Sequence, residues 1–187
     1  CGIGVFLEHG KYRKWDVFGV ELNEKARKTA EKRLRTSIFQ KLEDVKSELN
    51  FDAISLWHVL EHLPQPNKVL EKLHSLAAPG AALILGLPNR ESHDAGYYKE
   101  FWAAYDVPIH FWHFTKKDIE GIAKNTGWTV EAIKPMRLDA FYVSLLSESY
   151  KTGRKRWVHA FLRGLYSNLK GGQQNTSSLI YILRKRG

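Results

Sequence analysis

The chain has 187 residues, and 29 lysines and arginines against 20 aspartates and glutamates give it a formal net charge of +9. This length is sufficient for one domain with a sizeable apolar core, and 43% apolar and 26% charged residues are ordinary for a globular protein. No apolar run approaches the ~20 residues of a membrane-spanning helix, and a single cysteine excludes an internal disulfide framework. We therefore expect a cytoplasmic protein.

Strand and helix patterns alternate along the first part of the chain. Short apolar runs predict strands at 17–22, 51–57 and 81–87. Segments rich in helix-forming residues predict helices at 24–35 and 68–77, between those strands. This alternation favours a parallel sheet covered by helices.

An aromatic segment at 97–114 follows the third predicted strand. Thr115 then precedes a helical pattern with Asp118 three residues on, which is the spacing of a capping box. Gly127 is expected to end that helix.

The last third of the chain contains two further predicted strands, at 128–136 and 178–184. Between them, apolar positions at helical spacing predict a helical insertion around 139–170.

Two glycines and an acid form the first candidate binding site. Gly2 and Gly4 precede a helical pattern, and Glu21 ends the next strand. Glycines let a ligand approach the backbone at a helix N-terminus, and an acid at such a strand tip can accept hydrogen bonds from ribose hydroxyls. A dinucleotide fingerprint would need a third glycine where Leu7 stands, which disfavours NAD and FAD. The alternative interpretation is a plain turn beside a surface glutamate.

The segment from His58 to Glu61 and His62 formally matches H-x-x-E-H, a zinc-peptidase pattern. Zinc would need both histidines on one face of a stable helix and a third ligand elsewhere. Here the motif directly follows a strand and meets Pro64 two residues later. We therefore predict no metal site, and a catalytic or a structural role remains open for Glu61 and His62.

Four ordered segments together resemble one enzyme family. Residues 1–7 resemble the latter half of the class I methyltransferase signature acid-x-Gly-x-Gly-x-Gly, and 19–22, 51–62 and 79–89 are similar to later segments of the same family. The stretch 108–115 is also similar to the bacterial branch called methyltransferase type 23. The resemblance to these S-adenosylmethionine-dependent methyltransferases covers roughly residues 1–136.

The resemblance implies an α/β fold with a Rossmann-like, doubly wound sheet. The sheet would be mostly parallel and seven-stranded, with an antiparallel last strand. Its first strand, acid and glycine would precede Cys1. The chain 1–187 is accordingly expected to be a single methyltransferase domain, truncated at its N-terminus by a strand and a helix.

The resemblance also implies S-adenosylmethionine as the cofactor, held at the carboxyl ends of successive strands. The implied contacts are Gly2 and Gly4 beside the methionine part, Glu21 and Leu22 at the ribose, Leu42 and Glu43 near the adenine, and Trp57 and His58 beside the sulfonium.

Catalysis of methyl transfer depends mainly on alignment and on exclusion of water, and a base helps when the acceptor is a hydroxyl or an amine. His110, in the aromatic segment, and His62 are the candidate catalytic residues. Ordinary core packing is the alternative interpretation of the aromatic segment.

We expect methyl transfer to a small-molecule or lipid-like acceptor. One alternative is a non-catalytic S-adenosylmethionine-binding module. Another is a nucleic-acid methyltransferase, which the absence of an Asn/Asp-Pro-Pro-aromatic tetrad after Trp57 disfavours. The basic, amphipathic segment 151–170 could contact a membrane surface, cover the active site, form a dimer contact or pack on the domain.

Overall fold

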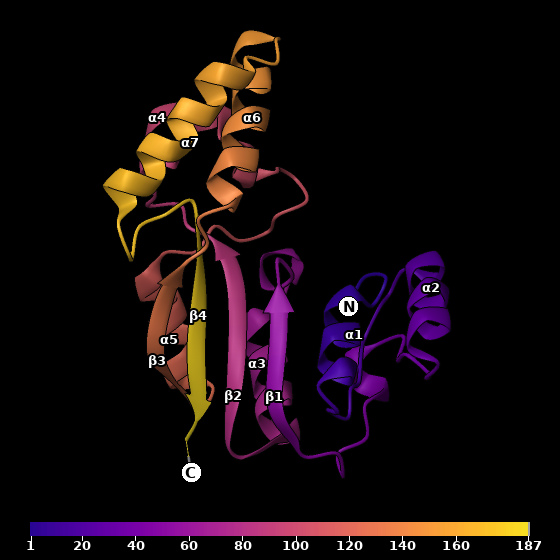
Figure 1. The fold of residues 1–187 in the computed structure, drawn as a ribbon. Helices are drawn as coiled ribbons and strands as arrows, with labels where there is room; N and C mark the ends of the chain where they lie inside the picture. The colour runs from indigo at the N-terminus through magenta and orange to yellow at the C-terminus, as the bar shows by residue number, and fades with distance from the viewer. Residues whose placement is uncertain (187) are drawn as a thin grey trace. The chain divides into compact units, whose positions relative to one another are not determined.

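The computed structural model describes residues 1–186, which form two compact units (Figure 1). The first comprises Cys1–Leu49, and the second, larger unit begins at Asn50.

The first unit contains the helices α1 (Val5–Tyr12) and α2 (Glu24–Leu34) and the 3₁₀ helix η1 (Leu42–Asp44). Asn23 caps α2 by accepting a hydrogen bond from the backbone of Ala26 at 3.0 Å. The predicted strand at 17–22 is reduced to one parallel bridge between Val20 and Phe39. A strand requires a paired neighbour along its length, and within this unit the described residues supply only that short pairing.

The second unit is built on a four-stranded sheet with the order β1-β2-β4-β3. Its strands are β1 (Phe51–Trp57), β2 (Ala77–Pro88), β3 (Trp128–Pro135) and β4 (Ser178–Lys185). Strands β1 and β2 pair in parallel, and β4 runs antiparallel to both of its neighbours.

The structure confirms the α/β class and the antiparallel last strand, but it corrects the strand count. Among the described residues the sheet has four strands, whereas seven were implied. The 17–22 segment, predicted as a strand, belongs to the other unit. Because β4 lies between β2 and β3, two of the three strand pairings are antiparallel, although β1, β2 and β3 run in the same direction.

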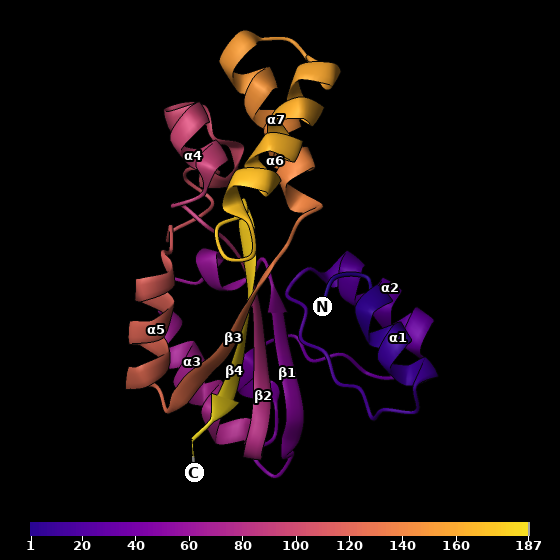
Figure 2. The ribbon, with the colours of Figure 1, turned by 60° about the vertical axis from the view of Figure 1, so that its left-hand side comes forward.

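The core of the second unit lies between this sheet and the helices α3 (Pro66–Leu76) and α5 (Lys116–Asn125), which pack on one side of it (Figure 2). Every second residue is buried from Ala81 to Leu87 on β2 and from Leu179 to Leu183 on β4, as the period of a strand requires. These residues also pair across the two strands: Leu83 with Leu183, Leu85 with Tyr181, and Leu87 with Leu179.

Three helices lie beyond the carboxyl ends of β1 and β2: α4 (His93–Tyr98), α6 (Asp139–Thr152) and α7 (Trp157–Gly171) (Figure 1). Helices α6 and α7 are the helical segment predicted around 139–170. Short 3₁₀ helices complete the unit: η2 (Leu60–His62), η3 (Lys99–Phe101) and η4 (Ala103–Tyr105).

A buried carboxylate ties this helical layer to the sheet. Asp94 on α4 accepts hydrogen bonds from the Trp102 indole at 3.0 Å, Ser167 on α7 at 2.8 Å and Ser177 before β4 at 2.6 Å. Three donors satisfy the carboxylate in the interior, where an unpaired charge would be costly.

Helix α5 begins with the predicted capping box. The Thr115 backbone and hydroxyl both donate to the Asp118 carboxylate, at 2.8 and 2.7 Å, and these bonds lower the pKa of Asp118. A carboxyl whose folded-state pKa lies below its unfolded-state value stabilises the fold above the unfolded value.

We predict that Asp118→Asn lowers the free energy of unfolding at pH 7 by about 1 kcal/mol, as expected for a lost cap. The deficit relative to the parent should shrink as the pH falls below about 4, where the parent carboxyl itself becomes protonated. Urea unfolding between pH 3 and pH 7 measures this deficit. Glu120→Gln, at an exposed residue of the same helix, is the control. A deficit that did not change with pH would contradict the assignment.

Candidate cofactor and acceptor sites

The glycine turn that precedes α1 uses its two glycines differently. Both have left-handed backbone conformations, with φ of +58° at Gly2 and +82° at Gly4. Gly4 is buried against α2, and a Cβ there would lie 3.1 Å from side-chain atoms of both Ala30 and Leu34. A Cβ on Gly2 would meet no atom within 4 Å. Gly4 therefore permits helix packing, whereas Gly2 leaves the backbone open to a ligand.

Glu21 is held against this turn by hydrogen bonds. Its carboxylate accepts from the backbone nitrogens of Gly2 at 2.7 Å and Asn23 at 3.0 Å. Burial raises the pKa of Glu21, but the hydrogen bonds from Asn23 and Gly2 outweigh it and leave the pKa below its ordinary value. The carboxylate is therefore ionised at neutral pH.

This arrangement fits a ribose. A carboxylate can accept about four hydrogen bonds, and the backbone N–H groups of Gly2 and Asn23 use two of them. Glu21 therefore keeps acceptor capacity for ribose hydroxyls, next to the open backbone of Gly2.

The residues expected at the ribose and adenine lie on neighbouring segments of the same unit. The Glu21 backbone donates to the Phe39 carbonyl at 2.9 Å, which brings the chain leading to η1 beside the chain leading to Leu22. Leu22 is 66% exposed, Leu42 is half-buried, and Glu43 is exposed on η1. Their predicted contacts with the cofactor remain predictions.

Trp57 and His58 belong to the second unit, where β1 ends. The Trp57 ring lies over β2 at Gly86, where a Cβ would approach the ring to 2.7 Å. His58 has φ of +49° and donates its backbone N–H to the Gly86 carbonyl at 2.9 Å. A non-glycine residue in this conformation is uncommon and often marks a functional position.

Glu61 follows on η2 and is buried, with only 1% of its surface exposed. Its Oε1 lies 3.4 Å from His58 Nδ1, and this contact raises the pKa of His58 despite the opposing effect of burial. The Glu61 carbonyl accepts hydrogen bonds from the backbones of Phe111 at 2.9 Å and Trp112 at 3.3 Å. The aromatic segment is thereby attached to η2.

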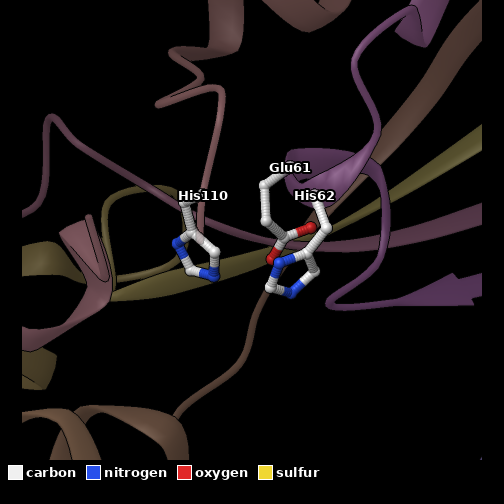
Figure 3. Close-up of side chains that lie close together, drawn as sticks. All are labelled: Glu61, His62 and His110. Carbon is white, nitrogen blue, oxygen red and sulfur yellow. The ribbon is translucent and has the colours of Figure 1, made fainter. Parts of the chain in front are cut away.

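His62 and His110, the two predicted catalytic residues, meet beside Glu61 (Figure 3). Their ring centroids are 4.5 Å apart in an edge-on arrangement. His110 Nδ1 lies 2.9 Å from the Ala104 carbonyl. His113 Nε2, in contrast, lies 2.8 Å from the Tyr105 carbonyl, a contact within the aromatic segment. Glu61 completes the group, although the sequence left a catalytic or a structural role open for this residue.

A family model described as a methyltransferase domain matches residues 1–133. The chain belongs to the class I S-adenosylmethionine-dependent methyltransferases. S-adenosylmethionine is the cofactor of this family.

Two curated relatives of this methyltransferase are named ubiquinone biosynthesis O-methyltransferase. The relative from Paraburkholderia phymatum is 29% identical over 98 residues, and that from Dechloromonas aromatica is 30% identical over 100 residues. Each match covers 48% of this chain and 42% of the relative. The matched part of the chain therefore spans less than half the length of these relatives.

Solved structures share the methyltransferase fold. An S-adenosylmethionine-dependent methyltransferase from Archaeoglobus fulgidus superposes with a TM-score of 0.65 at 19% identity, covering 99% of this chain and 83% of that one. The cyclopropane synthase MmaA2 from Mycobacterium tuberculosis gives a TM-score of 0.67 at 14% identity, covering 99% and 75%. At these identities the likeness concerns the fold.

The different environments of the two glycines predict separable effects in this methyltransferase. Gly2→Ala and Gly4→Ala should each lower the free energy of unfolding by about 1 kcal/mol, because alanine is strained in a left-handed backbone conformation. Gly4→Ala should lower it by about 1–3 kcal/mol more, because the added Cβ overpacks the contact with α2. Urea unfolding compares their stabilities, and calorimetry with S-adenosylhomocysteine should show that Gly2→Ala weakens binding. Equal stabilities of the two variants would contradict the proposed packing role of Gly4.

Proposed function

We propose that this protein transfers a methyl group from S-adenosylmethionine to a hydroxyl of a small-molecule or lipid-like acceptor. The observation that carries the proposal is the Glu21 carboxylate bound to the Gly2 turn, because it joins an ionised ribose acceptor to an open stretch of backbone. The names of the ubiquinone biosynthesis O-methyltransferases support a hydroxyl acceptor. The name cyclopropane synthase of a structural neighbour does not bear on the acceptor, because at 14% identity that likeness concerns the fold.

The chain's own residues would hold the cofactor and take up a proton. Gly2 and Glu21 would bind the methionine and ribose parts, and Trp57 and His58 would border the sulfonium. The bound cofactor supplies an electrophilic methyl group on its sulfonium and leaves as S-adenosylhomocysteine with the electron pair of the broken sulfur–carbon bond. A hydroxyl acceptor loses its proton as its oxygen bonds to that carbon.

His110 is suited to accept this proton. A backbone carbonyl only accepts hydrogen bonds, so the His110 Nδ1 beside the Ala104 carbonyl carries the ring proton. The Nε2 of the neutral ring then has a free lone pair. His62 lies beside it and would help to orient the acceptor.

The proposal is tested with methyl-labelled S-adenosylmethionine and phenols or catechols, with and without an alkyl tail. We expect labelled methyl ethers, and we expect Glu21→Ala to weaken S-adenosylhomocysteine binding by about 1–3 kcal/mol because a buried hydrogen bond is lost. The exposed Glu24→Ala is the matched control.

Cofactor binding without labelled product from any acceptor or from a cell extract would support the non-catalytic module instead. Unchanged affinity in Glu21→Ala would overturn the ribose assignment.

Helix α7 favours a lipid-like acceptor and contact with a membrane surface through 151–170. It packs against α6 through small residues, and a Cβ on Gly164 would lie 2.9 Å from the Phe141 ring. Its large apolar side chains are largely exposed, although the Phe161 ring also stacks on Phe141 of α6 with the ring centroids 5.1 Å apart. These side chains are exposed by 40–76%: Trp157, Val158, Phe161, Leu162, Leu165 and Leu169. The helix thus packs on the domain through its small residues and keeps most of its apolar face exposed.

Basic residues stand next to this apolar face. Lys151, Arg154, Lys155 and Arg156 surround the turn between α6 and α7, and all four are exposed. An apolar face with flanking positive charge is typical of helices that bind anionic lipid surfaces. Among the described residues no helix is long and apolar enough to cross a membrane. The proposed contact is therefore peripheral.

We predict that the protein sediments with vesicles containing phosphatidylglycerol and less with pure phosphatidylcholine, and that salt weakens the binding by screening. Replacing Trp157 and Phe161 together by alanine should lower the partition coefficient at least about tenfold, since two large apolar side chains no longer insert. Trp15→Ala, at a similarly exposed tryptophan of the first unit, is the control. Dimerisation without vesicle binding would assign this face to a second copy of the chain.

A further inference from the structure

The Glu61 carboxylate is buried without a hydrogen bond. Neither of its oxygens accepts one from the described residues, and its surface is 1% exposed. Asp94, the comparable buried carboxylate, accepts three. A buried carboxylate whose two oxygens lack donors is costly, and the contact with His58 at 3.4 Å involves only one oxygen. The contact with His58 therefore leaves the second carboxylate oxygen of Glu61 without a partner among the described residues.

Two imidazoles converge on this carboxylate. One ligand atom each from Glu61, His62 and His110 lie within 4.8 Å of one another. Figure 3 shows the Glu61 carboxylate and the His62 ring side by side, with the His110 ring facing them. His110 donates its Nδ1 proton to the Ala104 carbonyl, as metal-bound histidines commonly do to a backbone carbonyl, and this leaves Nε2 as the ligand atom.

The spacing is close to that of a metal centre. Nitrogen and oxygen ligands bind zinc at ~2.1 Å, so in tetrahedral geometry they lie about 3.4 Å from each other. Side-chain movements of about an ångström would bring the three groups to that spacing. His62 and His110 are only partly buried, which gives an ion and its water access to the group.

We propose that Glu61, His62 and His110 bind a divalent transition-metal ion. Two imidazole nitrogens and one carboxylate favour Zn²⁺, Co²⁺ or Mn²⁺ over Mg²⁺, which prefers oxygen ligands. Three protein ligands leave coordination positions open for water or, if the proposed methyl transfer is correct, for the acceptor hydroxyl. A bound ion lowers the pKa of such a hydroxyl, and His110 would then act as a ligand in place of a base.

This inference differs from the sequence prediction of no metal site for an identifiable reason. That prediction required a long helix carrying both histidines of H-x-x-E-H. The structure indeed has only the short η2 there, but His110 from the aromatic segment takes the place of His58. The hydrogen bond from the Phe111 backbone to the Glu61 carbonyl holds that segment in position.

The test is a Co²⁺ titration of the intact protein after treatment with a chelator, followed by visible absorption. We expect one equivalent of Co²⁺ to bind with a visible absorption band, Zn²⁺ to displace it, and Mg²⁺ to leave it unchanged. His110→Ala, His62→Ala and Glu61→Gln should each weaken binding more than about tenfold. His9→Ala, an exposed histidine on α1, should bind Co²⁺ like the parent.

Thermal unfolding separates loss of the site from loss of the fold. Glu61→Gln keeps the size and shape of the side chain, so the metal-free variant should still unfold in one cooperative transition. It should lose the stabilisation that Zn²⁺ gives the parent. Absence of Co²⁺ binding, or equal affinity in parent, Glu61→Gln and His110→Ala, would overturn the site.

The same preparations distinguish this proposal from the proposed function. Binding of S-adenosylhomocysteine by Glu61→Gln reports the cofactor site independently of the metal. Methyl transfer by metal-free protein at the parent rate, together with normal Co²⁺ binding, would overturn the role in the acceptor site and leave the metal site standing.

Discussion

The hydrogen bond from the His58 backbone to the Gly86 carbonyl determines where β1 ends, and the candidate acceptor site depends on that position. Gly86 has no side chain, so the Trp57 ring can lie over β2 while His58 turns into the left-handed region. The chain then forms η2 at once, which buries Glu61 and leaves His62 partly exposed. Backbone bonds to the Glu61 carbonyl bring in the aromatic segment with His110. Each step constrains the next, because the hydrogen-bonded pairing of β1 with β2 fixes the position and direction in which the chain leaves β1.

In the first unit, Glu21 combines a structural role with a proposed binding role. One carboxylate closes the glycine turn, caps the backbone at Asn23 and keeps acceptor capacity for a ligand. The hydrogen bonds that hold the turn also keep Glu21 ionised, so the structural and binding roles of this residue reinforce each other. Gly4 lets α2 pack closely against the turn, and Gly2 leaves the backbone of the turn open to a ligand.

Local features were predictable from the sequence. The capping box at Thr115 formed as predicted, and Asn23 caps α2 in the same way, because a side chain and a backbone N–H three residues apart meet at a helix start. The strand at 17–22 was over-predicted, because a run of apolar residues becomes a strand only where another strand pairs with it. The exposure of the apolar face of α7 could not be predicted from the sequence either. Helical periodicity identifies such a face but does not specify what it packs against.

The sequence by itself determined the family, the order of elements, the glycine turn with Glu21, and the pair His62 and His110 as candidate groups. Only the tertiary structure decided that Gly2 and Gly4 have different roles, that Glu61 is buried without a donor, and that His110 lies beside it. Motifs are stretches of neighbouring residues, so they can be read along the chain. Burial and the convergence of distant side chains depend on how the sheet and its loops pack, and no spacing in the sequence encodes that directly.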